Sequence, residues 1–112
     1  MEKNIRLRKK KDFALVFKYG KAVANHQFVL YVRNAPETER FRFGVSVSKK
    51  IGSAVVRNRI RRRVKEIVRQ MEPVIKPNVD IVCIIRKPAV DLDHEALKKS
   101  INHVFKRAGL FR

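Results

Sequence analysis

The residues best suited to chemistry lie in one basic stretch between positions 48 and 66. The stretch offers ammonium groups, guanidinium groups and one amide, at Lys49, Lys50, Arg57, Asn58, Arg59, Arg61, Arg62 and Lys65. A guanidinium can bind two phosphate oxygens at once, whereas a lysine acts as a point charge. Residues of these types at this density predict binding to a polyanion.

A helix that begins after Ser53 would position these cations, since serine is a preferred N-cap. At about 100° per residue, its apolar side chains fall within an arc of about 120°, at Val56, Ile60, Val64, Ile67, Val68 and Met71. The opposite side carries Asn58, Arg61, Arg62, Lys65 and Arg69. Only Glu66 offsets the repulsion among these cations, whereas a solvated helix face usually mixes charge signs. The helix is therefore predicted to bury one face and to bind a polyanion with the other.

Composition narrows the class of partner. The chain has 112 residues, enough for a single domain over residues 1–112, and a formal net charge of +18. Nucleic acid is the first candidate partner and an anionic membrane surface the second. No apolar run approaches the roughly 18 residues that span a bilayer, and residues 1–6 lack the apolar core of a signal peptide. With a single cysteine, Cys83, the chain is expected to be cytoplasmic and not to interact with membranes.

Catalytic or metal-binding residues are hard to assemble from this sequence. The three histidines, His26, His94 and His103, have no matching ligand spacing. An acidic group at positions 91, 93 and 95 could hold Mg²⁺ against a phosphate, but helix capping explains it with fewer assumptions. No glycine-rich phosphate loop is present. The residues alone predict a binding protein with no catalytic group and no metal site of its own.

The remaining elements predict an α+β fold. A first helix would run from near Asp12 to Gly20, with Phe13 and Phe17 as either core side chains or an aromatic ledge for unpaired bases. Hydrophobic alternation predicts strands over residues 27–33 and 40–48, and an apolar run predicts a buried strand over 79–85. A last helix would follow Asp91 or Asp93. These elements make a two-layer α-β sandwich, in which the general rule favours a right-handed strand–helix–strand crossover.

The segments 44–50 and 57–62 resemble the signature of the bacterial ribonuclease P protein subunit. Residues 6–17 resemble the first helix of that family, residues 24–31 its first strand, and residues 84–89 the exit from its last strand. The resemblance extends from about residue 6 to residue 111. It implies a small mixed sheet with three helices and a left-handed β-α-β crossover, against the general rule.

The resemblance also implies a function. In this family a large RNA carries the active site and, with Mg²⁺, removes the 5′ leader of precursor tRNA. The protein subunit, one monomer per RNA, binds ribonuclease P RNA and the precursor tRNA, so the chain would be part of an endoribonuclease without being its catalyst. A ribosomal-type or RNA-chaperone binding protein is the alternative, because such proteins share small basic α+β scaffolds.

Two groups of site residues follow from the resemblance. The catalytic RNA would contact the basic stretch already named, at Lys49, Lys50, Arg57, Asn58, Arg59, Arg61, Arg62 and Lys65. The single-stranded leader would lie in a cleft between the first helix and the sheet, at Arg6, Arg8, Lys9, Phe13, Phe17 and Tyr31. Arg63 is less expected, since its position borders the apolar stripe.

Overall fold

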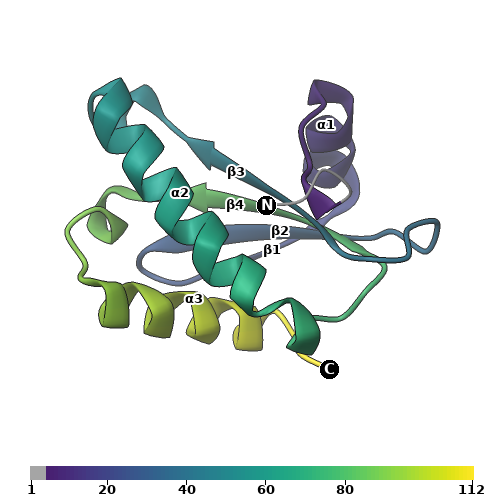
Figure 1. The fold of residues 1–112 in the computed structure, drawn as a ribbon. Helices are drawn as coiled ribbons and strands as arrows, with labels where there is room; N and C mark the ends of the chain where they lie inside the picture. Colours follow the sequence, from purple (N-terminus) through teal and green to yellow (C-terminus); the bar gives the residue numbers. More distant parts are fainter. Residues whose placement is uncertain (1–4) are drawn as a thin grey trace.

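The computed structural model describes residues 5–112, which form three helices around a four-stranded sheet (Figure 1). The expectation about a signal peptide concerns residues 1–6, of which residues 1–4 lie outside the described part. The helices are α1 (Lys10–Tyr19), α2 (Ala54–Gln70) and α3 (His94–Arg107). The strands are β1 (Lys21–Ala24), β2 (Phe28–Asn34), β3 (Arg42–Val47) and β4 (Val79–Ile85). Short 3-10 turns, η2 (Lys49–Ile51), η3 (Glu72–Val74) and η4 (Lys87–Ala89), join them.

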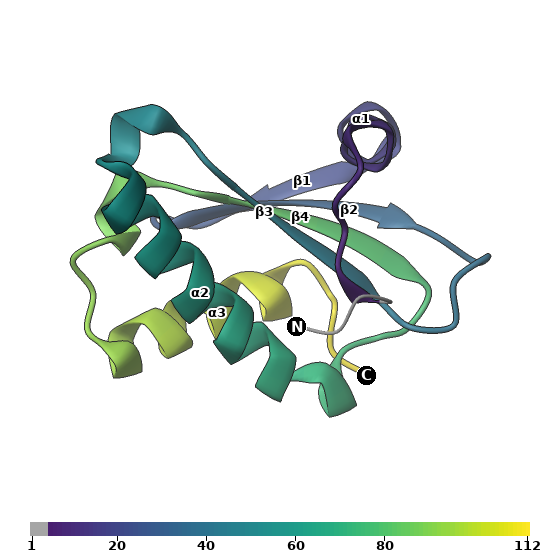
Figure 2. The ribbon, with the colours of Figure 1, turned by 45° about the horizontal axis from the view of Figure 1, so that its top comes forward.

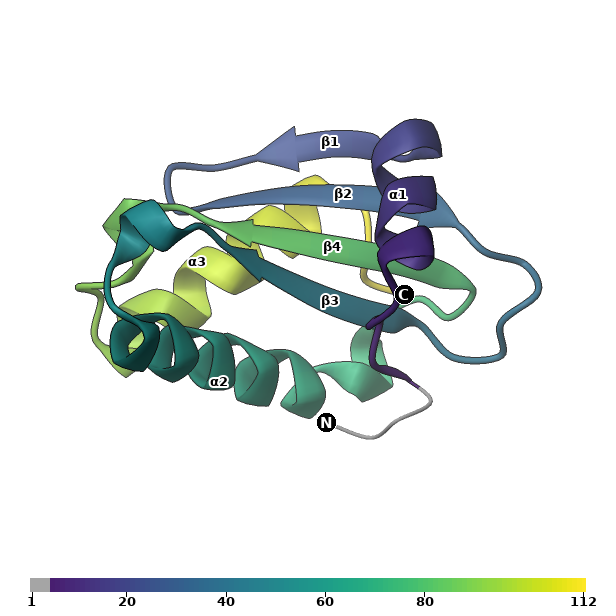
Figure 3. The same ribbon diagram turned by 90° about the horizontal axis from the view of Figure 1, so that it is seen from above.

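The sheet has the order β1-β2-β4-β3. Its β1/β2 and β2/β4 pairs are antiparallel, whereas β3 and β4 are parallel and are connected through α2. α2 returns on the side of the sheet opposite α1 (Figures 2 and 3). Figure 3 shows the sheet from the α1 side, with β3 and β4 both pointing to the left and β4 above β3. Seen from the opposite side, where α2 lies, and with both strands pointing up, β4 is to the left of β3. The crossover is therefore left-handed. The fold implied by the resemblance is confirmed, and the general right-handed rule fails here.

α2 and α3 cover one face of the sheet and enclose the main core. Buried side chains of the strands, including Phe28, Leu30, Phe43 and Ile81, meet the apolar stripes of both helices there. Within the predicted stripe of α2, Val56 alone is only half-buried. The Ser53 hydroxyl caps α2 by accepting a hydrogen bond from the amide of Val56 at 3.3 Å, as predicted.

The sequence offers two candidate N-caps for α3, Asp91 and Asp93, and the structure uses Asp93. The Asp93 carboxylate accepts a hydrogen bond from the amide of Ala96 at 2.8 Å, whereas Asp91 stands outside the helix. No helix among residues 5–112 is long and apolar enough to cross a membrane.

Strand β1 is absent from the sequence prediction, which has a helix followed by only three strands. It is four residues long, lies at the sheet edge and exposes three of its side chains, so no alternation of buried and exposed residues marks it. Pairing with β2, from Lys21 opposite Val32 to Ala24 opposite Val29, holds it in place. Tertiary pairing creates this strand, and its own propensity contributes little.

α1 crosses only part of the second sheet face. A small separate cluster fixes it there, in which Leu7, Val16 and Val82 are buried and Phe13 and Tyr31 are partly buried. Gly44, on the face of β3 that turns away from the main core, is buried beneath α1. A Cβ at Gly44 would lie 2.5 Å from Cζ of Phe13, so the glycine allows the helix to approach the sheet closely.

Candidate nucleic-acid interface

The first candidate surface is the outer side of α2, where the cations from position 57 to position 65 have no acidic partner among residues 5–112. Asn58, Arg59 and Arg62 are exposed, and Arg57, Arg61 and Lys65 are half-buried. Arg61 donates a hydrogen bond to the side-chain oxygen of Asn58 at 2.6 Å, which orients the guanidinium without neutralising it. The one carboxylate of α2, on Glu66, pairs with Arg69 at 2.5 Å near the end of the helix. Within residues 5–112, the cations from position 57 to position 65 therefore lack a carboxylate partner.

Lys49 and Lys50 extend this surface beyond the start of the helix. Both are exposed on the turn η2. The Ser48 hydroxyl accepts a hydrogen bond from the amide of Lys50 at 3.2 Å, which holds that turn next to the start of α2. The eight positions expected to contact the catalytic RNA thus lie on two consecutive elements.

Arg6 joins the same cationic surface from the N-terminal segment. Arg6 forms a parallel bridge with Phe43 at the free edge of β3, and the next residue, Leu7, donates its amide to the Phe43 carbonyl at 2.9 Å. Burial lowers the pKa of Lys65, and the positive charges of Arg6 and Arg61 lower it further. Arg6, expected at the leader cleft, therefore lies within electrostatic reach of α2.

Two buried nitrogen atoms in this region have no acceptor in the described chain. They are the Nε atoms of Arg6 and Arg57. A buried donor without an acceptor costs about 1 to 3 kcal/mol, more when it is charged. An anion that reached these groups would satisfy them and would also relieve the repulsion at Lys65.

The second candidate surface is the face of the sheet beside α1, where strand register sets side chains in three cross-strand rows. Strand register places Arg33, Asp80 and Arg42 side by side in the first row. The second row contains Tyr31, Val82 and Gly44, and the third contains Val29, Ile84 and Ser46. α1 packs over the second row, and the third row is half-exposed. The face of the sheet beside α1 therefore has a charged row on one side of the helix and a mainly apolar, half-exposed row on the other.

The aromatic side chains of α1 lie against this face of the sheet. The Phe17 ring is 42% exposed and meets the Tyr31 ring edge to face, with centroids 5.0 Å apart. The Phe13 and Phe17 ring centroids are 6.5 Å apart, and Phe13 is half-buried against Gly44. Of the two alternatives left open by the sequence, burial in the core is wrong for the exposed Phe17, whereas Phe13 packs in part against the sheet. Arg8 and Lys9 are exposed just before α1 begins.

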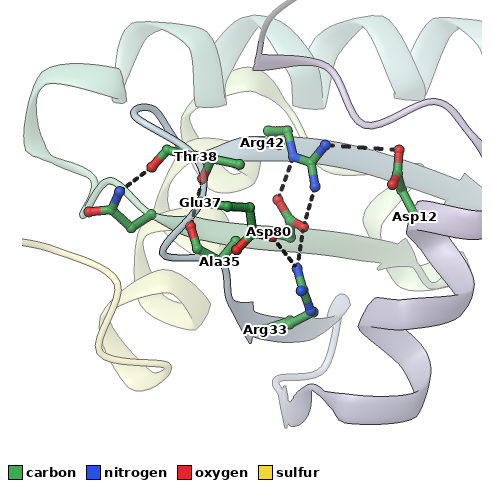
Figure 4. Close-up of polar contacts among 8 residues, drawn as sticks. Asp12, Arg33, Ala35, Glu37, Thr38, Arg42 and Asp80 are labelled. Carbon is green, nitrogen blue, oxygen red and sulfur yellow. Dashed lines mark hydrogen bonds and ion pairs between the residues drawn. The ribbon is translucent and has the colours of Figure 1, made fainter.

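The charged row anchors the start of α1 (Figure 4). Asp80 is 1% exposed and accepts two hydrogen bonds from Arg42, each at 2.7 Å, and one from Arg33 at 3.1 Å. These hydrogen bonds raise the pKa of Arg42. Arg42 also lies 3.9 Å from the Asp12 carboxylate of α1.

Asp80 is a structural residue that the sequence prediction missed. It lies inside the almost continuously apolar run 79–85, from which a buried strand was predicted. A carboxylate at that position, with arginines in both neighbouring predicted strands, was the available signal.

The side chains that could ligate a metal lie apart from one another in the described part of the chain. Within residues 5–112, no three His, Cys, Asp or Glu side chains come together as a metal site. Burial raises the pKa of Cys83, which opposes formation of a reactive thiolate. Arg63, unexpected at its position, donates a hydrogen bond to the Leu92 carbonyl at 2.9 Å and so links α2 to the segment before α3.

Comparison with known proteins identifies the family. The family described as Ribonuclease P matches residues 1–109. The chain belongs to the ribonuclease P protein family. It is 48% identical to the ribonuclease P protein component of Bacillus velezensis over 112 residues, which are 100% of this chain and 96% of that protein. Family membership makes it a component of ribonuclease P, a tRNA-processing endoribonuclease.

Solved ribonuclease P proteins share the fold closely. The Staphylococcus aureus RNase P protein superposes with a TM-score of 0.90 at 42% identity, over 96% of this chain and 98% of that one. The Thermotoga maritima RNase P protein superposes with a TM-score of 0.83 at 36% identity, over 91% of this chain and 96% of that one. The three helices and the mixed four-stranded sheet are thus those of ribonuclease P proteins.

Proposed function

We propose that this chain binds ribonuclease P RNA through α2 and η2 and holds the 5′ leader of precursor tRNA in the cleft beside α1. The RNA then hydrolyses the phosphodiester at the mature 5′ end, in the cytoplasm. The observation that supports this most directly is the set of cations at positions 57–65 without a carboxylate partner in the described chain. Their repulsion is relieved when RNA phosphates approach.

The two surfaces suit different parts of nucleic acid. Guanidinium and ammonium groups on α2 match the phosphates of a folded RNA, which bring charge but little sequence information. The partly exposed Phe17 and Tyr31 rings match unpaired bases, which stack on aromatic side chains in single strands. The half-exposed row of Val29, Ile84 and Ser46 continues the floor for such a strand.

The protein residues suit a supporting role for Mg²⁺ chemistry. The RNA would hold the Mg²⁺ ions that activate water and stabilise the leaving oxygen. The cations of α2 and Arg6 would neutralise nearby phosphates, so that fewer free Mg²⁺ ions are needed for RNA folding and substrate docking. The protein would act as one monomer per RNA.

The test reconstitutes the enzyme at low Mg²⁺ from a bacterial ribonuclease P RNA, this protein and a 5′-labelled precursor tRNA. Cleavage at the mature 5′ end should require both components. Tight RNA binding without stimulation of cleavage would favour a ribosomal-type or RNA-chaperone protein. Cleavage by the protein alone would overturn the assignment of catalysis to the RNA.

Affinity for two substrates tests the leader cleft separately. The holoenzyme should bind precursor tRNA more tightly than mature tRNA, because only the precursor carries the leader. Equal affinities would remove the leader from the cleft while leaving the RNA-binding role of α2 intact.

A further inference from the structure

A cavity of about 560 Å³ lies between the first half of α2 and the segment that joins η4 to α3. Figure 3 shows the start of α2 beside that segment. One wall carries Arg59 and Arg63 from α2, and the other carries Asp91 and Leu92. The cavity size falls in the range of about 300 to 1,000 Å³ typical of small-ligand sites. Apart from Arg59, its lining residues belong neither to the residues expected to bind the leader nor to the cations expected to contact the catalytic RNA.

The two walls differ in the polar groups that they leave free. Arg63 is committed to the Leu92 carbonyl at 2.9 Å, and the Asp93 carboxylate is committed to capping α3. Arg59 and Asp91 are both exposed, and neither has a hydrogen-bond or ion-pair partner in the part of the chain that the structure describes. The cavity therefore offers one free guanidinium on the α2 side and one free carboxylate on the opposite side.

The apolar part of the cavity is formed by aliphatic side chains from both walls. Val56 and Ile60 line the α2 side, and Leu92 lines the other. Ile60 is buried, whereas Val56 and Leu92 are half-buried. A planar group that enters between the walls would contact aliphatic carbons and could also lie against the fixed Arg63 guanidinium, a surface on which bases stack.

We infer that this cavity receives one unpaired guanosine of the RNA bound by α2, with its phosphate at Arg59 and its base edge at Asp91. This inference rests on the proposed function. The carboxylate repels phosphate, so the RNA backbone stays on the α2 side and a base must point across the cavity. Guanine presents two adjacent donors, N1–H and N2–H, to the two oxygens of a carboxylate. Adenine, cytosine and uracil lack that pair of donors.

A divalent cation fits these residues less well than a base. Asp91 is the one free carboxylate of the cavity, because Asp93 caps the helix. The guanidinium groups of Arg59 and Arg63 on the facing wall would repel a bound cation. No three metal-ligating side chains gather anywhere in residues 5–112.

The first test exploits the sign of an electrostatic effect. Asp91→Asn removes a negative charge beside a polyanion, so charge alone predicts tighter binding of ribonuclease P RNA. Base recognition predicts the opposite, an affinity about tenfold lower, because the amide cannot accept both guanine donors. Tighter or unchanged binding by the variant would overturn the inference. The chain keeps its Asp93 cap, and circular dichroism would verify folding.

The second test identifies the base in the RNA. Inosine lacks the guanine N2 amino group and therefore cannot make one of the two hydrogen bonds to the carboxylate. RNA carrying random inosine substitutions is selected for binding to the wild-type protein and, in parallel, to Asp91→Asn. Substitution at one unpaired guanosine should weaken binding to the wild-type protein and leave binding to the variant unchanged. No position with this behaviour would refute a guanosine in the cavity.

A cavity-filling variant provides the third test. Val56→Phe should lower RNA affinity about tenfold by occupying the space of the base. Its matched control is Val23→Phe, which fills a separate cavity of about 330 Å³ beside β1 and should leave the affinity unchanged. Equal affinities of both variants would contradict the inference. If the wild-type protein itself fails to bind the RNA, the proposed function fails, whereas normal wild-type binding with these negative results removes only the guanosine site.

Discussion

The arginines of the sheet and the arginines of α2 have different surroundings. Arg33 and Arg42 share the buried carboxylate of Asp80, so their charges are matched within the protein. Arg57 and Arg61 have no carboxylate partner among the described residues, and the Nε atom of Arg57 is buried without an acceptor. The matched arginines hold Asp80 within the sheet, and Arg42 also reaches Asp12 of α1, whereas the unmatched arginines are expected to pair with an external anion.

The largest expected effect is a loss of stability when the shared carboxylate of Arg33 and Arg42 is removed. Asp80→Asn should lower the free energy of unfolding by about 2 to 4 kcal/mol, because it leaves two partly buried guanidinium groups without their shared counter-charge. Urea denaturation measures the loss. Glu66→Gln is the control, since it breaks an exposed ion pair with Arg69 and should change stability little. Equal effects of the two variants would remove the distinction between matched and surface charges.

The next effect concerns the aromatic ledge that the matched group positions. Phe17→Ala should weaken binding of precursor tRNA to the holoenzyme by about 1 to 3 kcal/mol if a leader base stacks there. Binding of mature tRNA should not change, and competition binding with both substrates separates the two. The control, Tyr19→Ala, removes an exposed aromatic ring that stacks on neither Phe17 nor Tyr31. The same loss in both variants would show that the ledge has no specific role.

The unmatched arginines should affect binding and not folding. If about 6 to 8 phosphates are neutralised, log K should fall against log salt with a slope of about −4 to −7. Arg61→Ala and Arg62→Ala should each reduce the steepness by about one, with little change in the urea midpoint. Lys98→Ala, an exposed cation of α3, is the control. A slope that stays the same for Arg61→Ala and Arg62→Ala would place the RNA on another surface.

Local patterns predict the helices of this fold better than they predict the sheet face that faces α1. The N-caps Ser53 and Asp93 and the apolar stripe of α2 act within a few residues, so periodicity and capping suffice to find them. The β1 strand and the Arg33–Asp80–Arg42 row depend on residues up to 47 positions apart. No local sequence pattern marks a strand that is held only by pairing with its neighbour. The handedness of the crossover was predicted from the family resemblance alone.

The candidate site shows the same division between local and long-range information. The cations of α2 lie within a few residues of one another in the sequence, and their surface is visible in a helical projection. A helical projection does not show that Arg6 lies near Lys65, because this depends on where the N-terminal segment crosses the edge of β3. Leader contacts at the aromatic ledge and RNA contacts at α2 remain predictions that the binding experiments address.

The smallest expected effect is a change in the stability of the free protein when one unmatched cation of α2, Lys65, is neutralised. Burial and the nearby Arg6 and Arg61 lower the pKa of Lys65, so the folded protein disfavours its charged form. Lys65→Gln should therefore slightly raise the melting temperature of the free protein at neutral pH while weakening RNA binding. Lys98→Gln, on an exposed site, should do neither.

The pH dependence of that difference follows from linkage. Because the folded-state pKa of Lys65 is below its unfolded value, the penalty of the charged form is complete below the folded-state pKa. It disappears as pH rises through that pKa and Lys65 loses its proton. The stability advantage of Lys65→Gln should thus shrink at alkaline pH. A variant that is less stable than wild type at neutral pH would mean that the aliphatic part of Lys65 contributes more by packing than its charge costs, and that α2 is not strained by its unmatched cations.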